Sequence, residues 1–299
     1  MRRLLGFALV LCGLYGPAAA GPEPDIAYGA YQRGLFLTAF REATDRLTRN
    51  PADTAAMTLI GELYNQGLGI VGDPVKATEW YRLAAARGDA HALSALGMMA
   101  LDGRGMAADQ KQARAWLEQA AAKGEPTASY NVALLNLSSG NPADLPRAVE
   151  LLRKAAEAEI GDAQHALGVL YLQGRGINRD PAEAARWFER AARNRNLAGQ
   201  VEHAILQFNG EGLPANEALA AKGFRRAAAQ GNAIAQNRLA RLYASGRGVP
   251  RNKVEAAAWH MAAAAQGLDD TWLDDALKDL SPDERTRAER LAAERTRSF

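Results

Sequence analysis

Cysteine is almost absent from this sequence, because Cys12 is the only one among 299 residues. It lies in an apolar stretch, residues 4–15, which follows Arg2-Arg3 and precedes Ala18-Ala19-Ala20. A basic start, an apolar stretch and a small-residue cleavage site are the three parts of a secretory signal peptide. We therefore expect cleavage after Ala20. The mature chain would then lack cysteine, which excludes disulfides, thiolate metal sites and a cysteine nucleophile.

Long apolar runs and an excess of charge are also missing. The apolar stretch has 12 residues, whereas a helix that crosses a membrane needs about 20. A membrane anchor is therefore the less favoured interpretation, and we expect a periplasmic or secreted protein. Loss of Arg2 and Arg3 lowers the basic residues from 36 to 34, equal to the 34 acidic residues. A net charge near zero predicts no nucleic-acid partner.

The motifs of common catalytic and metal sites are absent too. The four histidines are His91, His165, His203 and His260. None lies in an H-E-x-x-H motif or has a second histidine four residues away, so we expect no metal. No Ser-x-x-Lys motif, the nucleophile signature of β-lactam-recognising enzymes, occurs. We therefore expect no catalytic residue and no cofactor.

A repeat of about 36 residues is the strongest signal that is present. If Trp187 is taken as position zero, equivalent positions lie 35 or 36 residues apart, at Trp80, Trp116, Leu151, Trp187, Gly223 and Trp259. Alanine stands three residues before each of them, at Ala77, Ala113, Ala148, Ala184, Ala220 and Ala256. It stands again four residues after, at Ala84, Ala120, Ala155, Ala191, Ala227 and Ala263. Six copies in one register indicate six structural repeats.

Each repeat predicts two helices. The second opens with Asp or Asn, residue types that cap helix N-termini, at Asp73, Asp109, Asp144, Asp180, Asn216 and Asn252. The two alanines and the large residue at position zero are expected to form its buried face. The first helix carries a small residue that permits close approach of a neighbour, at Gly61, Gly97, Ala133, Gly168, Ala204 and Ala240.

A Gly-x-Gly motif joins the two helices in five repeats: Gly67-Leu68-Gly69, Gly103-Arg104-Gly105, Gly174-Arg175-Gly176, Gly210-Glu211-Gly212 and Gly246-Arg247-Gly248. A glycine-rich loop before a helix can hold a phosphate, but a phosphate loop would not exchange Arg for Glu. An apolar residue always follows, at Ile70, Met106, Ile177, Leu213 and Val249. The motif therefore predicts a helix stop in left-handed backbone and an apolar plug. The third repeat departs from it, with S-S-G-N-P-A-D.

These residues resemble the Sel-1-like repeat family, relatives of the tetratricopeptide repeats. LIGELYNQGLGIVGDPVKATEWYRLAAARGD and ALGVLYLQGRGINRDPAEAARWFERAA follow that family's pattern almost throughout. The resemblance implies an all-α, right-handed superhelical solenoid of antiparallel helix pairs. Departures are Gly223 at position zero, and Glu159 and Arg195 where other repeats have a helix-ending glycine. We expect a signal peptide at 1–20, a capping helix pair at 21–53, six repeats at 54–267 and capping helices at 268–299.

The resemblance also implies a concave surface, lined by first-helix residues six and three before, and one and four after, the small position. In the second to fifth repeats these positions form an apolar strip, which we call the predicted strip: Met98, Leu101, Tyr130, Leu134, Leu137, Val169, Leu172, Val201, Ile205 and Phe208. Two interpretations stay open. The strip is a groove for a partner, as solenoid concavities provide, or the superhelix is tight enough to bury it.

We interpret the chain as a non-enzymatic, monomeric adaptor or regulator that binds a protein or peptide in this groove. It is similar to exported alphaproteobacterial members of the family, which include a periplasmic regulator that restrains a sensor kinase. The alternative is a hydrolase acting on β-lactams or the cell wall, because cysteine-rich members of the wider family have been described as binding or hydrolysing β-lactams. The missing cysteines and the missing Ser-x-x-Lys disfavour that alternative.

Overall fold

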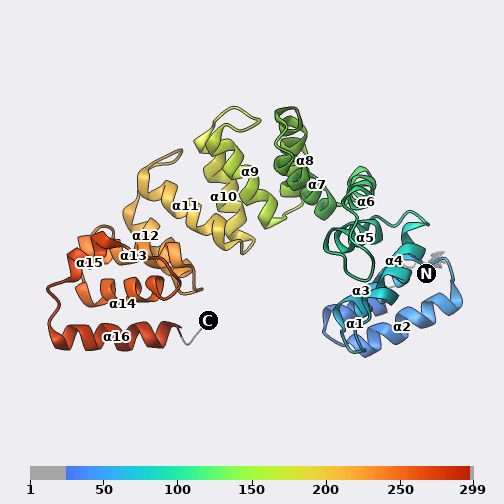
Figure 1. Cartoon of the computed structure of the whole chain (residues 1–299), viewed down its shortest axis with the longest axis horizontal. Coiled ribbons are helices and arrows are strands. Elements are labelled where there is room, and N and C mark those ends of the chain that lie inside the picture. Colours follow the sequence, from blue (N-terminus) through green and yellow to red (C-terminus); the bar gives the residue numbers. More distant parts are fainter. Residues whose placement is uncertain (1–24, 297–299) are drawn as a thin grey trace, which may run out of the picture. The chain divides into compact units, whose positions relative to one another are not determined.

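The computed structural model describes residues 25–296, and every regular element in this part of the chain is a helix (Figure 1). The predicted signal peptide and the last three residues lie outside the described part. The chain divides into two compact units between Arg87 and Gly88. None of the described helices has the length and apolar character that a membrane crossing requires.

The first unit contains four helices: α1 (Ile26–Gln32), α2 (Phe36–Arg49), α3 (Thr54–Gln66) and α4 (Pro74–Ala85). The helices α1 and α2 pack together, as do α2 with α3 and α3 with α4. Phe40 of α2 and Tyr64 of α3 meet edge to face, with ring centroids 5.8 Å apart. The pair α1 and α2 lies in the stretch where the sequence predicts a capping pair, and it covers the apolar face of α3.

The second unit begins with five helix pairs: α5 (Ala90–Asp102) and α6 (Gln110–Ala122), α7 (Pro126–Ser138) and α8 (Leu145–Glu157), α9 (Gly161–Gln173) and α10 (Pro181–Arg193), α11 (Leu197–Asn209) and α12 (Glu217–Ala228), α13 (Ala233–Ser245) and α14 (Lys253–Ala264). Two further helices close it: α15 (Thr271–Leu277) and α16 (Pro282–Thr296). Consecutive helices from α5 to α14 pack on one another. The all-helical solenoid predicted from the sequence is confirmed.

The deepest side chain of most second helices is the residue directly after position zero, a buried position that the sequence interpretation did not include. Residues one after position zero keep at most 2% of their exposure in the first five repeats: Tyr81, Leu117, Leu152, Phe188 and Phe224. The alanines three before and four after position zero are fully buried, as expected. At about 100° per residue the two alanines lie between position zero and the residue after it, so these two residues flank one helix face on opposite sides. Trp80 and Trp116 are only half-buried, whereas Leu151, Trp187 and Trp259 are buried at 6–9% exposure.

The small residues of the first helices make room for these buried side chains. A Cβ atom added to Gly61 would lie 2.8 Å from the ring of Tyr81, and one added to Gly168 would lie 2.6 Å from the ring of Phe188. The predicted close approach is therefore confirmed. Burial of a side chain of this size contributes about 1.5–3 kcal/mol, so each contact is a principal link within its helix pair.

Five of the six predicted N-caps close their helices. The side chains of Asp73, Asp109, Asp180, Asn216 and Asn252 accept hydrogen bonds from backbone N–H groups of the first turn. Asp144 is the exception, because the third repeat places it in a short 3-10 helix, η1 (Pro142–Asp144), directly before α8. Its carboxylate instead accepts a hydrogen bond from the Ser139 hydroxyl at 2.8 Å.

The two glycines of each Gly-x-Gly motif have different roles. The first ends a helix in left-handed backbone, with φ between 66° and 75° at Gly67, Gly103, Gly174, Gly210 and Gly246. In four motifs the second glycine, at Gly69, Gly176, Gly212 or Gly248, rests against the first turn of an earlier helix. A Cβ atom at Gly176 would lie 2.8 Å from that of Leu145, and one at Gly248 would overlap the carbonyl oxygen of Glu217. The motif is therefore a helix stop followed by a backbone contact between repeats.

Side-chain amides link consecutive helices in the fourth to sixth repeats. Three glutamines, each four residues before the small position, accept hydrogen bonds from the end of their own second helix: Asn194 to Gln164, Gln230 to Gln200 and Gln266 to Gln236. Gln164 and Gln236, both fully buried, also donate to the carbonyl oxygens of Ala156 and Ala228 in the preceding helix. These buried amides are therefore satisfied, as burial requires.

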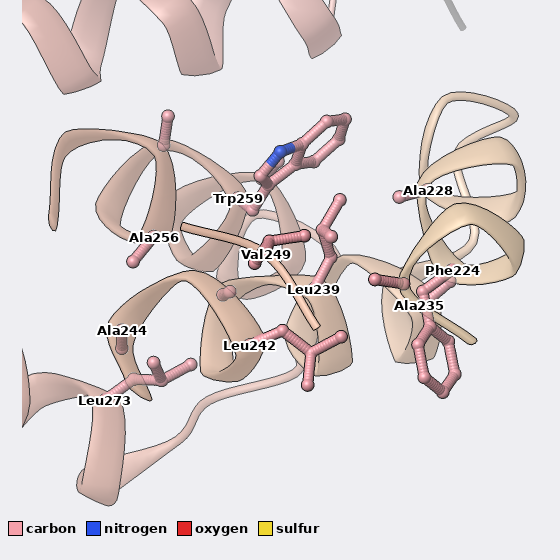
Figure 2. Close-up of a cluster of buried hydrophobic side chains, with 14 of the residues drawn as sticks. Phe224, Ala228, Ala235, Leu239, Leu242, Ala244, Val249, Ala256, Trp259 and Leu273 are labelled. Atoms are coloured by element: carbon pink, nitrogen blue, oxygen red, sulfur yellow. The ribbon is translucent and has the colours of Figure 1, made fainter. Parts of the chain in front are cut away.

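The end of the second unit is closed by α15 and α16. Leu273 of α15 lies in the same buried cluster as Leu239 and Trp259 (Figure 2). The guanidinium of Arg295, on α16, lies 3.9 Å from the ring centroid of Trp259 and pairs with Glu255 at 2.7 Å. The cap thus covers the last repeat with an apolar inner side and a charged outer side, as a solenoid end requires.

Candidate functional site

The predicted strip lies on the first helices of the second unit, and most of it keeps part of its exposure. Val201 is buried at 3% exposure, and Leu134 is exposed at 38%. The other eight residues are half-buried: Met98, Leu101, Tyr130, Leu137, Val169, Leu172, Ile205 and Phe208. The structure therefore neither buries the strip completely nor leaves it as a flat apolar patch.

Several strip residues also support the core. Val169 and Leu172 pack against a cluster that contains Phe188 and Leu206. Burial and the nearby carboxylate of Asp162 raise the pKa of Tyr130, which keeps its phenol neutral at physiological pH. These residues thus form an apolar wall that is held in place by the helices behind it.

A pocket of about 490 Å³ lies at the C-terminal end of the strip, and we call it the arginine pocket. It combines Ile205 and Phe208 of the strip with side chains of α13, the following loop and α15. Its lining consists of Ile205, Phe208, Asn209, Phe224, Arg238, Arg241, Leu242, Ser245, Arg247 and Trp272. The volume lies within the range of pockets that hold small ligands or single peptide side chains with their neighbours.

Arg241 is held rigidly at one side of this pocket. It forms two hydrogen bonds to the carboxylate of Asp270, of 2.6 and 2.8 Å, and its guanidinium lies 5.1 Å from the ring centroid of Trp272. Burial opposes ionisation of Asp270, but the hydrogen bonds from Arg241, Asn237 and the Leu273 backbone together lower its pKa to about 2. The pair is therefore charged on both sides at physiological pH.

Arg247 is held in a similar way at the mouth of the pocket. Its guanidinium pairs with Glu217 at 2.5 Å and lies 4.3 Å from the ring centroid of Phe208. A guanidinium over an aromatic face is attracted by the ring electrons. Arg247 is the variable middle residue of the Gly-x-Gly motif, and in this repeat it therefore contacts the side chains of the preceding repeat.

Arg238 supplies the positive charge that the pocket does not neutralise. It is exposed and forms no ion pair among residues 25–296. Arg238 interacts electrostatically with Glu202, whose pKa is raised because burial outweighs this smaller opposing effect. The pocket therefore offers apolar rings beside guanidinium groups, an arrangement that suits a carboxylate next to an apolar side chain.

Sequence reasoning found only part of this pocket. The strip register located Ile205 and Phe208, and in the sixth repeat the same register falls on Arg241, one residue after Ala240. It missed Arg238, which lies two residues before the small position, and Trp272, which comes from the capping helix α15. The sequence did carry a signal for Arg238. It lies three residues before Arg241 on the same helix, and this spacing places both arginines on one helix face.

The histidines form no common site. His91 pairs with Glu125 at 3.0 Å, and His260 contacts Asp274 at 2.8 Å, in different repeats. His165 lies beside Phe188, and His203 lies on α11. Within the described residues no group of three His, Cys, Asp or Glu side chains is placed to hold a metal ion.

Comparison with known proteins places the repeats in a family. The model of the Sel1 repeat matches six stretches, 54–89, 90–125, 126–159, 161–196, 197–232 and 233–268. A Sel1 repeat protein from Oxalobacter formigenes has a similar structure, with a TM-score of 0.69 and 26% identity over 80% of this chain and 98% of that one. The protein c5321, a protective antigen of uropathogenic Escherichia coli with an SLR fold, gives a TM-score of 0.57 and 23% identity over 88% of this chain. The chain spans 65% of the length of c5321. None of the curated proteins matches it in sequence.

Proposed function

Because the chain belongs to the Sel1 repeat family, we propose that it is a non-enzymatic scaffold that holds an extended segment of a partner protein along the predicted strip. Solenoids of this kind generally present concave surfaces to other proteins. The partner segment carries an acidic group next to an apolar side chain, and these two groups enter the arginine pocket together.

The composition of the arginine pocket carries this proposal. Arg241 and Arg247 are fixed by ion pairs and by aromatic faces, so they lose little freedom when a ligand binds. Arg238 adds a charge that no carboxylate pairs with in the described part of the chain. Ile205, Phe208 and Trp272 supply the apolar surface beside these charges. A carboxylate that enters without an apolar neighbour would leave that surface in water.

A selection of peptides tests the proposal. The purified mature protein is used to sort a surface-displayed library of random dodecapeptides, and the enriched peptides are measured by fluorescence anisotropy. We expect them to share an acidic residue beside an apolar one. Ile205→Lys should weaken their binding at least about tenfold, because a charge in the strip costs more than 1 kcal/mol.

The control is Lys111→Glu, a charge change on α6 at an exposed residue outside the strip. Circular dichroism shows whether each variant keeps its helices. Enriched peptides without an acidic residue, or equal binding by Ile205→Lys and Lys111→Glu, would remove the pocket from the binding surface.

The site of action is proposed to be the periplasm or the exterior of the cell. This proposal rests on Arg2-Arg3, the apolar stretch 4–15 and the small residues up to Ala20. Fusion of alkaline phosphatase after residue 40 tests it, because that enzyme needs the oxidising environment outside the cytoplasm. We expect phosphatase activity that depends on residues 1–20, and equal activity with and without them would contradict export.

A further inference from the structure

The fifth repeat departs from the others at two positions, one on each of its helices. Position zero is Gly223, where the other repeats have tryptophan or leucine. The residue directly before the small position is His203. In the other five repeats that residue is aliphatic and at most 1% exposed: Ile60, Leu96, Val132, Leu167 and Leu239. His203, by contrast, is only half-buried.

Both departures line one cavity of about 320 Å³ between α10, α11 and α12, which we call the Gly223 cavity. Its lining consists of Glu189, Ala192, Arg193, Gln200, His203, Ala204, Gln207, Leu219, Lys222, Gly223 and Arg226. It shares no residue with the arginine pocket. Its walls carry polar and charged groups, whereas a cavity that stays empty inside a protein is apolar. At Gly223 itself a Cβ atom would lie 2.9 Å from that of Ala204, so α11 and α12 approach closely beside the cavity.

The fourth repeat shows what this space would accept. There, Trp187 stands at position zero, and Arg190, three residues later, lies with its guanidinium 4.5 Å from the tryptophan ring centroid. In the fifth repeat Arg226 holds the position of Arg190 and lines the cavity, but Gly223 provides no ring beneath it. An aromatic ring in the cavity would therefore meet a guanidinium as Trp187 does.

The charges of the cavity add a second requirement. Glu189 pairs with Arg193 at 2.5 Å, which neutralises both. Lys222 and Arg226 form no ion pair within the described residues, so the cavity keeps a positive charge. Gln200 donates to the carbonyl oxygen of Gly223 at 3.1 Å and thereby fixes the cavity floor. An anionic group on the ring would meet Lys222 and Arg226.

We propose that the Gly223 cavity binds a small aromatic acid, with the ring in the place of the missing tryptophan under Arg226 and the acid group against Lys222. The half-buried imidazole of His203 lies in the same lining and supplies a hydrogen-bonding group for the ligand. This site is independent of the strip and of the proposed partner.

Calorimetric titration of the mature protein with indole-3-propionate tests the site, with indole and propionate as separate arms. We expect one site per chain and binding at least about tenfold tighter than for either component, because both ring and charge contribute. Arg226→Gln should weaken it about tenfold. Arg225→Gln is the matched control, because Arg225 is the neighbouring arginine and does not line the cavity.

A variant whose own side chain fills the Gly223 cavity provides the decisive comparison with the original chain. The double variant Gly223→Trp, His203→Leu restores the residue types of the other repeats. Its tryptophan must displace the methyl group of Ala204, which lies 2.9 Å from a Cβ atom at position 223, and overpacking of this kind lowers the stability of the fold. We expect it to fold and to bind no indole-3-propionate. Undetectable binding by the original chain at millimolar ligand would overturn the proposal, as would unchanged binding by the double variant. If that variant does not fold, equal affinities of Arg226→Gln and Arg225→Gln would overturn it.

Discussion

Glu159 and Arg195 end their helices in left-handed backbone, with φ of 63° and 61°, where the other repeats have glycine. This conformation costs a residue with a side chain about 1–2 kcal/mol. Glycine avoids that cost but loses more entropy on folding. For Arg195→Gly we therefore expect a gain of about 0.5–1 kcal/mol in the free energy of unfolding, measured by urea denaturation.

Glu159→Gly is the matched comparison, and we expect no gain from it. The carboxylate of Glu159 accepts hydrogen bonds from Arg190, from Asn194 at 2.6 Å and from Gln164 at 2.9 Å. Hydrogen bonds from Asn194, Arg190 and Gln164 lower its pKa to about 2, so these bonds persist in mild acid. Equal gains from both substitutions would show that this network contributes nothing.

Two partly buried histidines should make the folded protein less stable in mild acid. Burial lowers the pKa of His165 and of His203 below the usual 6.5, against a smaller opposing effect of Asp162 and Glu189 respectively. A proton then binds the unfolded chain more tightly than the folded one, so stability falls as the pH drops below about 6.5. The double variant His165→Leu, His203→Leu should show a flatter dependence of unfolding free energy between pH 7 and 5. An unchanged slope would place the acid sensitivity elsewhere.

At the scale of the element, the two glycines of one loop should differ in cost. Gly246→Ala places a Cβ atom in left-handed backbone and 3.3 Å from the Cβ atom of Arg251, a tight contact without overlap, so we expect a loss of about 1–2 kcal/mol. Gly248→Ala also forces a Cβ atom into the backbone of Glu217. We expect it to cost about 2–4 kcal/mol in urea unfolding. Equal losses of stability for the two variants would mean that the contact between Gly248 and the preceding repeat contributes nothing.

The helices could be predicted from the sequence because each repeat carries local signals in a fixed register. Caps such as Asp180, the helix-ending Gly174 and the alanines of the second helix all act within a few residues of their position. The burial of Trp187 was predicted correctly, but the deeper burial of Phe188 was not, because it depends on the ring packing against Gly168 of the first helix. Asp144 failed as a cap because the shortened loop of the third repeat folds into η1.

At the scale of the whole molecule, the cap helix α16 should stabilise the last repeat as well as itself. Ala288 and Ala292 are buried, and Arg295 covers the ring of Trp259. Deletion of residues 281–299 exposes this ring and the end of the last repeat. We expect red-shifted tryptophan emission, a lower midpoint of urea unfolding and self-association in sedimentation. Arg295→Ala should reproduce part of the shift, and an unchanged midpoint after the deletion would contradict a capping role.

The candidate site was only partly predictable because its parts come from distant segments. The strip follows from one register within the repeats, so Ile205 and Phe208 could be identified from the sequence. Trp272 lies outside the repeat pattern, and its place above Arg241 depends on how α15 packs against α13. The Gly223 cavity depends likewise on three helices meeting, although the unusual Gly223 was visible in the sequence.

The central claim is that the arginine pocket recognises an acidic group on a partner segment, and a charge exchange tests it most directly. The affinity of a selected peptide, and of the same peptide with its acidic residue changed to lysine, is measured for the original chain and for Arg238→Glu. We expect Arg238→Glu to bind the acidic peptide at least about tenfold more weakly and to prefer the lysine peptide, as a direct pairing requires. An unchanged preference for the acidic peptide would contradict the claim.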